Sequence, residues 1–246
     1  MNLKASPEER IEILKKWIAE SDNIVFFGGA GVSTESNIPD FRSANGLYNQ
    51  KHDYPPETIL SHSFYMRNMK EFYRFYKKKM VILNAKPNAA HLKLAQLEKQ
   101  GKLKAIVTQN VDGLHQAAGS KTVFELHGSA HRNYCTKCGR LFGLDYIVAA
   151  ADVPVCDVCG GTVKPDVVLY EEGLDNDTVS GAINAISRAD VLIVGGTSLV
   201  VYPAAGLIDY YKGNKLVLIN KSSTPKDSIA DLIICDSIGK VFAQID

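Results

Sequence analysis

Short runs of apolar and β-branched residues recur along the chain, and they lack the alternation of apolar and polar positions that marks a half-exposed strand. They fall at residues 23–27, 104–108, 122–126, 166–170, 190–196, 215–220 and 231–235. Continuous apolar runs of this length are typical of strands covered on both faces, as in a parallel sheet. Helical patterns lie between many of the runs, so the sequence predicts an open α/β sheet of the Rossmann type.

Two predicted helices have recognisable features, one before the first run and one between two runs. Ser6 is a favoured N-cap residue, Pro7 suits a first helical turn and Glu9 completes a capping box, so a helix is predicted to begin there. Its apolar stripe consists of Ile11, Leu14, Trp17 and Ile18. A second helix is predicted over residues 89–99, and its apolar positions include Leu92, Ala95 and Leu97.

Two stretches interrupt the alternation of strand and helix. Residues 43–85 are polar and rich in aromatic residues and look helical, and residues 128–165 hold four of the five cysteines. The chain is therefore predicted to form a single unit over residues 1–246, in which these two insertions make a smaller lobe. The large Rossmann lobe is predicted from residues 1–42, 86–127 and 166–246. Because open α/β sheets bind ligands at the carboxyl ends of their strands, we expect the site in a cleft between the lobes.

Charge and composition exclude several classes of protein. The 28 basic and 27 acidic side chains leave a net charge of +1, so no overall field would hold a nucleic acid or an anionic membrane. The sequence has no apolar run long enough to span a bilayer, and the first residues do not read as a signal peptide. We therefore expect a cytoplasmic protein with no membrane contact and no specific nucleic-acid partner.

The paired cysteines have the spacing of a metal site. Cys135-x-x-Cys138 and Cys156-x-x-Cys159 are separated by 17 residues, as in a zinc ribbon. Four thiolates would fill a tetrahedral Zn²⁺ and leave no position for water, so the predicted metal is one structural Zn²⁺, with rubredoxin-like iron as the main alternative. A ribbon that binds nucleic acid is disfavoured because its basic residues are few and dispersed. Cys235 stands alone at a predicted strand end, where we expect a small core residue.

A glycine-rich turn follows the first predicted strand. Gly29-Ala30-Gly31 could present backbone N–H groups to a pyrophosphate, although the same residues could simply form a tight strand-to-helix turn. Thr34 stands where a dinucleotide fingerprint has its third glycine, and no acidic residue clearly follows about twenty positions on. The loop therefore departs from the pattern of hydride-transferring enzymes.

The motifs that surround this loop occur in a diagnostic order. "GAGVSTESNIPDFR" is followed by "TQNVDGLHQAAG", "ELHG", the four cysteines, "GTSLVVYPAA" and "VLIN". From about residue 20 to residue 242 the chain resembles the sirtuins, which are NAD-dependent protein-lysine deacylases, and among them the bacterial members. The resemblance implies that NAD is consumed as a co-substrate, with its nicotinamide as the leaving group.

The resemblance also assigns an NAD site. It implies that Arg42 suits the pyrophosphate, that Phe41 shields the ribose, and that Val111 and Asp112 hold the nicotinamide carboxamide. The full predicted set is Gly29, Ala30, Gly31, Thr34, Phe41, Arg42, Gln109, Val111, Asp112, Thr197, Ser198, Asn220 and Lys221, with Asn110 counted as catalytic. From the residues alone, Asn110 and Asp112 could be turn formers, Arg42 a surface charge and Thr197-Ser198 a helix N-cap.

The reaction is predicted to depend on His127, which matches the family's catalytic histidine in "ELHG" and would act as a general base toward a ribose hydroxyl. Residues 165–172 match the segment that pairs with the substrate as an added strand, with Val168 and Tyr170 in contact with it. The implied activity transfers the acetyl group of a protein lysine to ADP-ribose and gives nicotinamide and O-acetyl-ADP-ribose.

Some residues depart from the family pattern. Tyr170-Glu171-Glu172 replaces a usual Phe-Gly-Glu, so Glu171 is expected to put bulk and charge near the peptide channel. Asn37 replaces a usual glycine, with little effect expected because Asn tolerates positive φ. Acetyl-lysine is the favoured substrate. The rival readings are a hydride-transferring dehydrogenase, a mono-ADP-ribosyltransferase and a non-catalytic zinc-ribbon module.

Overall fold

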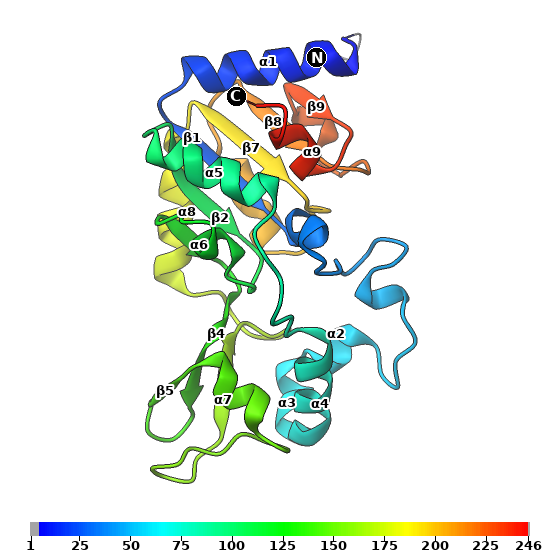
Figure 1. Cartoon of the computed structure of the whole chain (residues 1–246), viewed down its shortest axis with the longest axis vertical. Coiled ribbons are helices and arrows are strands. Elements are labelled where there is room, and N and C mark those ends of the chain that lie inside the picture. Colours follow the sequence, from blue (N-terminus) through cyan, green and yellow to red (C-terminus); the bar gives the residue numbers. More distant parts are fainter. Residues whose placement is uncertain (1–4, 246) are drawn as a thin grey trace.

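The computed structural model describes residues 5–245 and contains a six-stranded parallel sheet in the order β3-β2-β1-β7-β8-β9. Its strands are β1 (Ile24–Gly28), β2 (Leu103–Thr108), β3 (Val123–Glu125), β7 (Val191–Gly195), β8 (Leu216–Ile219) and β9 (Leu232–Ile234). The chain builds the sheet outward from β1 in two directions, which makes the gap between the carboxyl ends of β1 and β7 the topological switch point. The predicted Rossmann-type sheet is confirmed (Figure 1).

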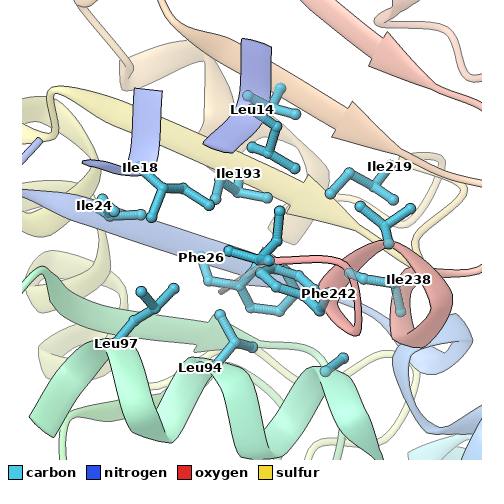
Figure 2. Packing of buried hydrophobic residues seen from close by; sticks show 14 of the residues in the cluster. Leu14, Ile18, Ile24, Phe26, Leu94, Leu97, Ile193, Ile219, Ile238 and Phe242 are labelled. Atoms are coloured by element: carbon cyan, nitrogen blue, oxygen red, sulfur yellow. The ribbon is translucent and has the colours of Figure 1, made fainter. Parts of the chain in front are cut away.

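Helices cover both faces of this sheet. One face packs against α1 (Pro7–Glu20), α5 (Ala89–Lys99) and α9 (Ile238–Phe242), and Figure 2 shows Phe26 of β1 among Leu94, Leu97 and Phe242. The other face packs against α8 (Asn176–Arg188) and the 3₁₀-helix η3 (Ala204–Tyr210), where Val25 and Phe27 are buried. Because successive residues of β1 enter two different cores, every position must be apolar, which explains the missing alternation.

The two helices expected from the sequence are present. The Ser6 hydroxyl accepts a hydrogen bond from the Glu9 N–H at 3.2 Å, and the Glu9 carboxylate accepts one from the Ser6 N–H at 2.6 Å, so the capping box forms. Helix α5 has the predicted bounds Ala89–Lys99. Leu92 was expected on its apolar side but is 55% exposed, because the buried stripe runs through Ala90, Leu94 and Leu97 instead.

A second group of elements lies beyond the carboxyl edge of the large sheet (Figure 1). An antiparallel sheet in the order β5-β4-β6 consists of β4 (Gly128–Cys135), β5 (Leu141–Phe142) and β6 (Val163–Val167). The remaining elements here are α7 (Leu144–Ala149), η2 (Leu47–Asn49), α2 (Pro56–Ile59), α3 (His62–Arg67) and α4 (Met69–Lys79). Residues 43–85 contain four of these helices, as the sequence predicted, joined by loops, and Ser61 forms an isolated bridge with Tyr170.

The helical insertion and the cysteine-bearing insertion share one core. Phe72, Tyr73 and Tyr76 of α4 are buried in the same cluster as Ile147 and Val163. The Tyr73 hydroxyl donates to the Val163 carbonyl at 2.6 Å, so α4 is also hydrogen-bonded to β6. The two stretches, separated in sequence by β2 and β3, therefore depend on each other for burial.

One predicted strand is placed differently. Residues 166–170 were read with the runs of the parallel sheet, but β6 covers Val163–Val167 and pairs antiparallel with β4. Gly128 explains this pairing, since a Cβ atom there would lie 1.9 Å from the Asp166 carbonyl oxygen, and its φ of +75° suits glycine. Residues 168–170 then continue past β6 without joining the parallel sheet.

The described residues also include α6 (Leu114–Ala117), η1 (Ala30–Ser36) and η4 (Asp227–Ile229). Among residues 5–245, none of the helices has the length and apolar character needed to cross a membrane.

Candidate active site

The loops after β1 and β7 meet at the switch point. The Gly29 N–H donates to the Gly195 carbonyl at 3.2 Å, and the Gly31 N–H donates to the Gly196 carbonyl at 2.7 Å. A Cβ atom on Gly31 would lie 2.8 Å from the Gly196 Cα atom. The glycines are thus needed for the close approach of two loops, and two of the N–H groups expected to face a pyrophosphate already have partners inside the protein.

A row of polar side chains crosses the ends of β2, β7 and β8. The Thr197 hydroxyl donates to Gln109 Oε1 at 3.2 Å, and the Thr197 N–H donates to Asn220 Oδ1 at 2.9 Å. The Nε2 atom of Gln109 and the Nδ2 atom of Asn220 are buried without a hydrogen-bond partner among the described residues. Buried donors without a partner are costly, so the row suits a ligand rich in acceptor oxygens, such as a phosphate or ribose.

A second network joins the loop after β1 to the loop after β2. The hydroxyl of Ser33, a fully buried residue, donates to Asp112 Oδ2 at 2.7 Å and accepts from Asn110 Nδ2 at 3.1 Å. The other Asp112 oxygen accepts from the Leu114 N–H at 2.9 Å. Asp112 does form the turn that precedes α6, which was one of the interpretations that the sequence left open. The same carboxylate is also hydrogen-bonded to Ser33 in the loop after β1.

His127 lies where the two sheets meet. Its Nδ1 atom is 2.9 Å from the Gln109 carbonyl oxygen, which can only accept, so Nδ1 carries the proton and Nε2 has the free lone pair. Burial lowers the pKa of His127 below its usual value, and the hydrogen bond to the Gln109 carbonyl opposes this effect. The ring is therefore neutral near pH 7 and has the tautomer that a general base acting through Nε2 requires.

Backbone hydrogen bonds join the segment around His127 to β2 and to the residue that follows β6. The Val168 N–H donates to the His127 carbonyl at 3.0 Å, and the Leu126 N–H donates to the Thr108 carbonyl at 2.9 Å. The Val168 carbonyl accepts no hydrogen bond from the part of the chain that the structure describes. The predicted base and the predicted substrate segment are thus adjacent, and one backbone acceptor of that segment remains available.

The other predicted site residues lie around the same edge. The Phe41 ring contacts the Tyr48 ring edge-on, with 5.6 Å between their centroids, and the Arg42 guanidinium lies 5.1 Å from the centre of the Tyr48 ring. The Thr34 hydroxyl donates to the Gly31 carbonyl at 2.9 Å. Val111 packs toward the smaller core, and its carbonyl accepts from the Ala130 N–H. Ala30 is half-buried, and Ser198 and Lys221 are exposed.

The segment that follows Val168 is anchored to the helical insertion. The Tyr170 N–H donates to the Leu60 carbonyl at 3.0 Å. Glu171 has a φ of +76° and accepts from the Ser63 N–H at 2.8 Å and the Ser63 hydroxyl at 3.0 Å. Its carboxylate is therefore engaged at the start of α3, and the unusual backbone angle at this position is held by those bonds. Asn37 has a φ of +63°, as its tolerance of positive φ allows.

The four paired cysteines converge at the end of β4. Their sulfur atoms all lie within 4.8 Å of one another, and Cys135 and Cys159 are 3.4 Å apart. A Zn²⁺ bound to four thiolates at about 2.3 Å needs sulfur separations of about 3.8 Å, so the donor set fits this ion. Cys135 and Cys156 each begin a turn, and each turn is closed by the N–H of the glycine four residues on. Cys235 is exposed, so the expectation of a core residue is wrong; it follows the last buried residue of β9.

Sequence reasoning missed Ser33 and His91. Ser33 joins Asn110 to Asp112, and its position two residues after Gly31 in the glycine loop was the available signal. His91 and His115 are buried with their ring centroids 4.8 Å apart, close behind this network. Burial lowers the pKa of His115 to about 3 and that of His91 to about 4, so both rings are neutral at pH 7.

Comparison with known proteins agrees with this geometry. Residues 29–203 match the model of the Sir2 family, and the chain is 65% identical to an NAD-dependent protein deacetylase of Clostridium acetobutylicum over 96% of this chain and 98% of that protein. A relative of the same description from Clostridium perfringens is 63% identical over 97% of this chain and 99% of its own length. The chain belongs to the Sir2 family.

Solved structures of Sir2 proteins have the same fold. A complex of a Sir2 variant with a deacetylated p53 peptide and 3′-O-acetyl ADP-ribose matches with a TM-score of 0.87 at 40% identity, covering 95% of this chain and 96% of that one. A Sir2 complex with a p53 peptide and NAD⁺ matches with a TM-score of 0.84 at 42% identity, covering 95% of both chains.

Proposed function

We propose that this protein is an NAD-dependent protein-lysine deacetylase that transfers the acetyl group of acetyl-lysine to ADP-ribose. The observation that carries the proposal is the placement of His127. Its Nδ1 atom is fixed by the Gln109 carbonyl beside the polar row that suits NAD, and its own carbonyl binds the Val168 N–H of the segment that suits the peptide. A single neutral base would thus stand between the sites of two substrates.

Each side of the site has a distinct task. NAD supplies the ADP-ribose that receives the acetyl group, and nicotinamide leaves. Asp112, oriented by Ser33 and Leu114, would hold the nicotinamide carboxamide together with Val111, while Asn110 lies beside them. Gln109 and Asn220, oriented by Thr197, would bind phosphate or ribose oxygens through their buried donors that lack partners. His127 Nε2 would take a proton from a ribose hydroxyl.

The remaining predicted contacts are part of the same proposal. The cation of Arg42 and the ring of Phe41 lie on the loop after β1, in reach of a phosphate and of a ribose face. Ala30, Thr34, Ser198 and Lys221 would also border the bound NAD.

On the peptide side, Val168 would pair with the acetyl-lysine backbone as an added strand, and Tyr170 would lie beside it. The free Val168 carbonyl supports this pairing. Protein substrates would therefore be recognised mainly through their backbone, with loose sequence selectivity.

The cysteine cluster would hold one structural Zn²⁺. Four protein ligands leave no open position, so the ion would stabilise the smaller core and take no part in the reaction. The lobe division at residues 43–85 and 128–165 remains our proposal, and it is supported by a core that both insertions share. A cytoplasmic location is also proposed, on the ground that none of the five cysteines forms a disulfide.

The test is an incubation with NAD and an acetyl-lysine peptide, followed by mass spectrometry. Deacetylated peptide, nicotinamide and O-acetyl-ADP-ribose in equal amounts are expected. NADH would indicate a dehydrogenase, an ADP-ribosylated peptide a transferase, and no turnover a binding module. His127→Ala should abolish turnover while ADP-ribose still binds.

His52→Ala is the matched control for the histidine variant. The His52 ring also bonds a backbone carbonyl, that of Leu47 at 2.8 Å, but it packs on Phe75 away from Gln109. Turnover by His127→Ala that equals turnover by His52→Ala would exclude the assigned role of the base.

A further inference from the structure

The loop that carries Phe41 and Arg42 is joined to the segment that carries Val168 by a pair of tyrosine hydroxyls. The hydroxyl oxygens of Tyr48 and Tyr170 are 2.5 Å apart and share a hydrogen bond. From this contact, and resting on the proposed function, we infer that the Tyr48–Tyr170 pair makes the binding of NAD and of the acetyl-lysine peptide depend on each other. Tyr48 and Tyr170 are positioning residues in this account.

Tyr48 is firmly attached to the NAD side. Its backbone N–H donates to the Phe41 carbonyl at 2.8 Å, and its ring contacts both the Phe41 ring and the Arg42 guanidinium. The N–H of the neighbouring Leu47 donates to the Asp40 carbonyl at 2.8 Å. These contacts close residues 40–48 into a compact loop, so the position of the Tyr48 hydroxyl fixes the side chains that would meet the ribose and the phosphates.

Tyr170 is equally well attached on the peptide side. Its N–H donates to the Leu60 carbonyl, its own carbonyl accepts from the His62 N–H at 2.9 Å, and Glu171 next to it is bound by Ser63. Two residues upstream, the Val168 N–H is bound by the His127 carbonyl. The backbone of this segment is therefore held at several points, and the Tyr170 hydroxyl lies where it can support the loop of residues 40–48.

The Tyr48 hydroxyl does not ionise in the working range of pH. Burial raises the pKa of Tyr48 well above its usual value, and the hydrogen bond to the Tyr170 hydroxyl raises it further. Tyr48 is half-buried and Tyr170 is 37% exposed, so water competes for the bond only in part. The contact is a neutral hydrogen bond. Replacing either tyrosine by phenylalanine removes this bond and keeps the aromatic ring.

The expected consequence is positive coupling between the two ligands. A peptide paired with Val168 restricts the segment that carries Tyr170, and through the hydroxyl pair it restricts the loop that carries Arg42. Part of the ordering cost of NAD binding has then already been met, so the nucleotide binds more tightly when the peptide is present. A neutral hydrogen bond of this kind changes an equilibrium by roughly three- to tenfold.

The test measures this coupling by calorimetry with two ligands that do not react with each other, ADP-ribose and an acetyl-lysine peptide. The affinity for ADP-ribose is determined with and without saturating peptide for the wild-type chain, Tyr48→Phe, Tyr170→Phe and the double variant. We expect the ratio of the two affinities to fall roughly three- to tenfold in each single variant and no further in the double variant, because both substitutions remove the same bond. Tyr210→Phe, at an exposed tyrosine of η3 on the large lobe, should keep the wild-type ratio.

Three outcomes would overturn the inference: a ratio unchanged or increased in the single variants, additive losses in the double variant, or an equal loss in Tyr210→Phe. Thermal unfolding of each variant shows that the comparison concerns folded protein. The proposed function fails in a different way, through the absence of nicotinamide release by the wild-type chain with acetylated peptide, so the two ideas are separable.

Discussion

Gly128 offers the sharpest test of how the two sheets are joined, because a second glycine provides its control. Gly128 and Gly101 have φ values of +75° and +76°, but a Cβ atom at Gly128 would lie 1.9 Å from the Asp166 carbonyl oxygen, whereas a Cβ atom at Gly101 would have no atom within 4 Å. Alanine at either position meets the same backbone penalty of about 1–2 kcal/mol. Only at Gly128 must a neighbouring strand also move.

The steric part can be worked from the structure. An ordinary contact begins near 3.4 Å, so β4 and β6 would have to separate by about 1.5 Å at Gly128. Overpacking of this kind costs roughly 1–3 kcal/mol beyond the backbone penalty. For a chain of this length, Gly128→Ala should melt roughly 2–12 °C below Gly101→Ala. Because the Val168–His127 hydrogen bond lies next to the clash, kcat/KM for deacetylation should fall more than about tenfold in Gly128→Ala only.

The assay is thermal unfolding together with steady-state deacetylation of one peptide by both variants. If Gly128→Ala were no less stable than Gly101→Ala and equally active, the close approach of β4 and β6 would not determine the geometry of the site.

Three further outcomes follow from the site. Ser33→Ala should lower kcat/KM roughly 10- to 100-fold because a carboxylate loses a charge-assisted hydrogen bond, while Ser187→Ala near the end of α8, where the hydroxyl donates to the Asn184 carbonyl, should not; equal effects would exclude the network. Cys156→Ala should abolish the one zinc per chain measured by elemental analysis and lower the melting temperature, and unchanged metal content would exclude the cluster. The free energy of unfolding should fall as pH drops from 7 to 5, because His91 and His115 have folded-state pKa values below 6.5 and the unfolded chain takes up protons first; a flat profile from urea titrations would contradict this.

The sequence was most informative where burial on two sides or a fixed spacing constrained it. The strands β1 and β7 are apolar at every position because both faces are covered, the start of α1 followed from its capping residues, and the bounds of α5 followed from local pattern. The spacing of the cysteines anticipated their convergence. The family prediction is confirmed by relatives that are 63–65% identical.

The misplaced or missed features depend on contacts distant in sequence. β6 alternates buried and half-buried residues around Pro165, a poor strand former, and its partner was decided by the space that Gly128 leaves. Glu171 was expected to charge the peptide channel, but its carboxylate lies against Ser63, which nothing in the sequence indicated. Ser33 gained its role only because the loops after β1 and β2 come together.

The core shared by the two insertions also sets the order of events during translation. The aromatic side of α4, with Phe72, Tyr73 and Tyr76, leaves the ribosome nearly 90 residues before β6 does, and at ordinary elongation rates this gap lasts roughly 4–18 s. Throughout that interval the nascent chain exposes an aromatic, aggregation-prone surface, because the residues that pack against it have not yet been synthesised. A cell short of zinc would prolong the same interval, so aggregation of newly made chains should respond to metal supply before the activity of mature enzyme does.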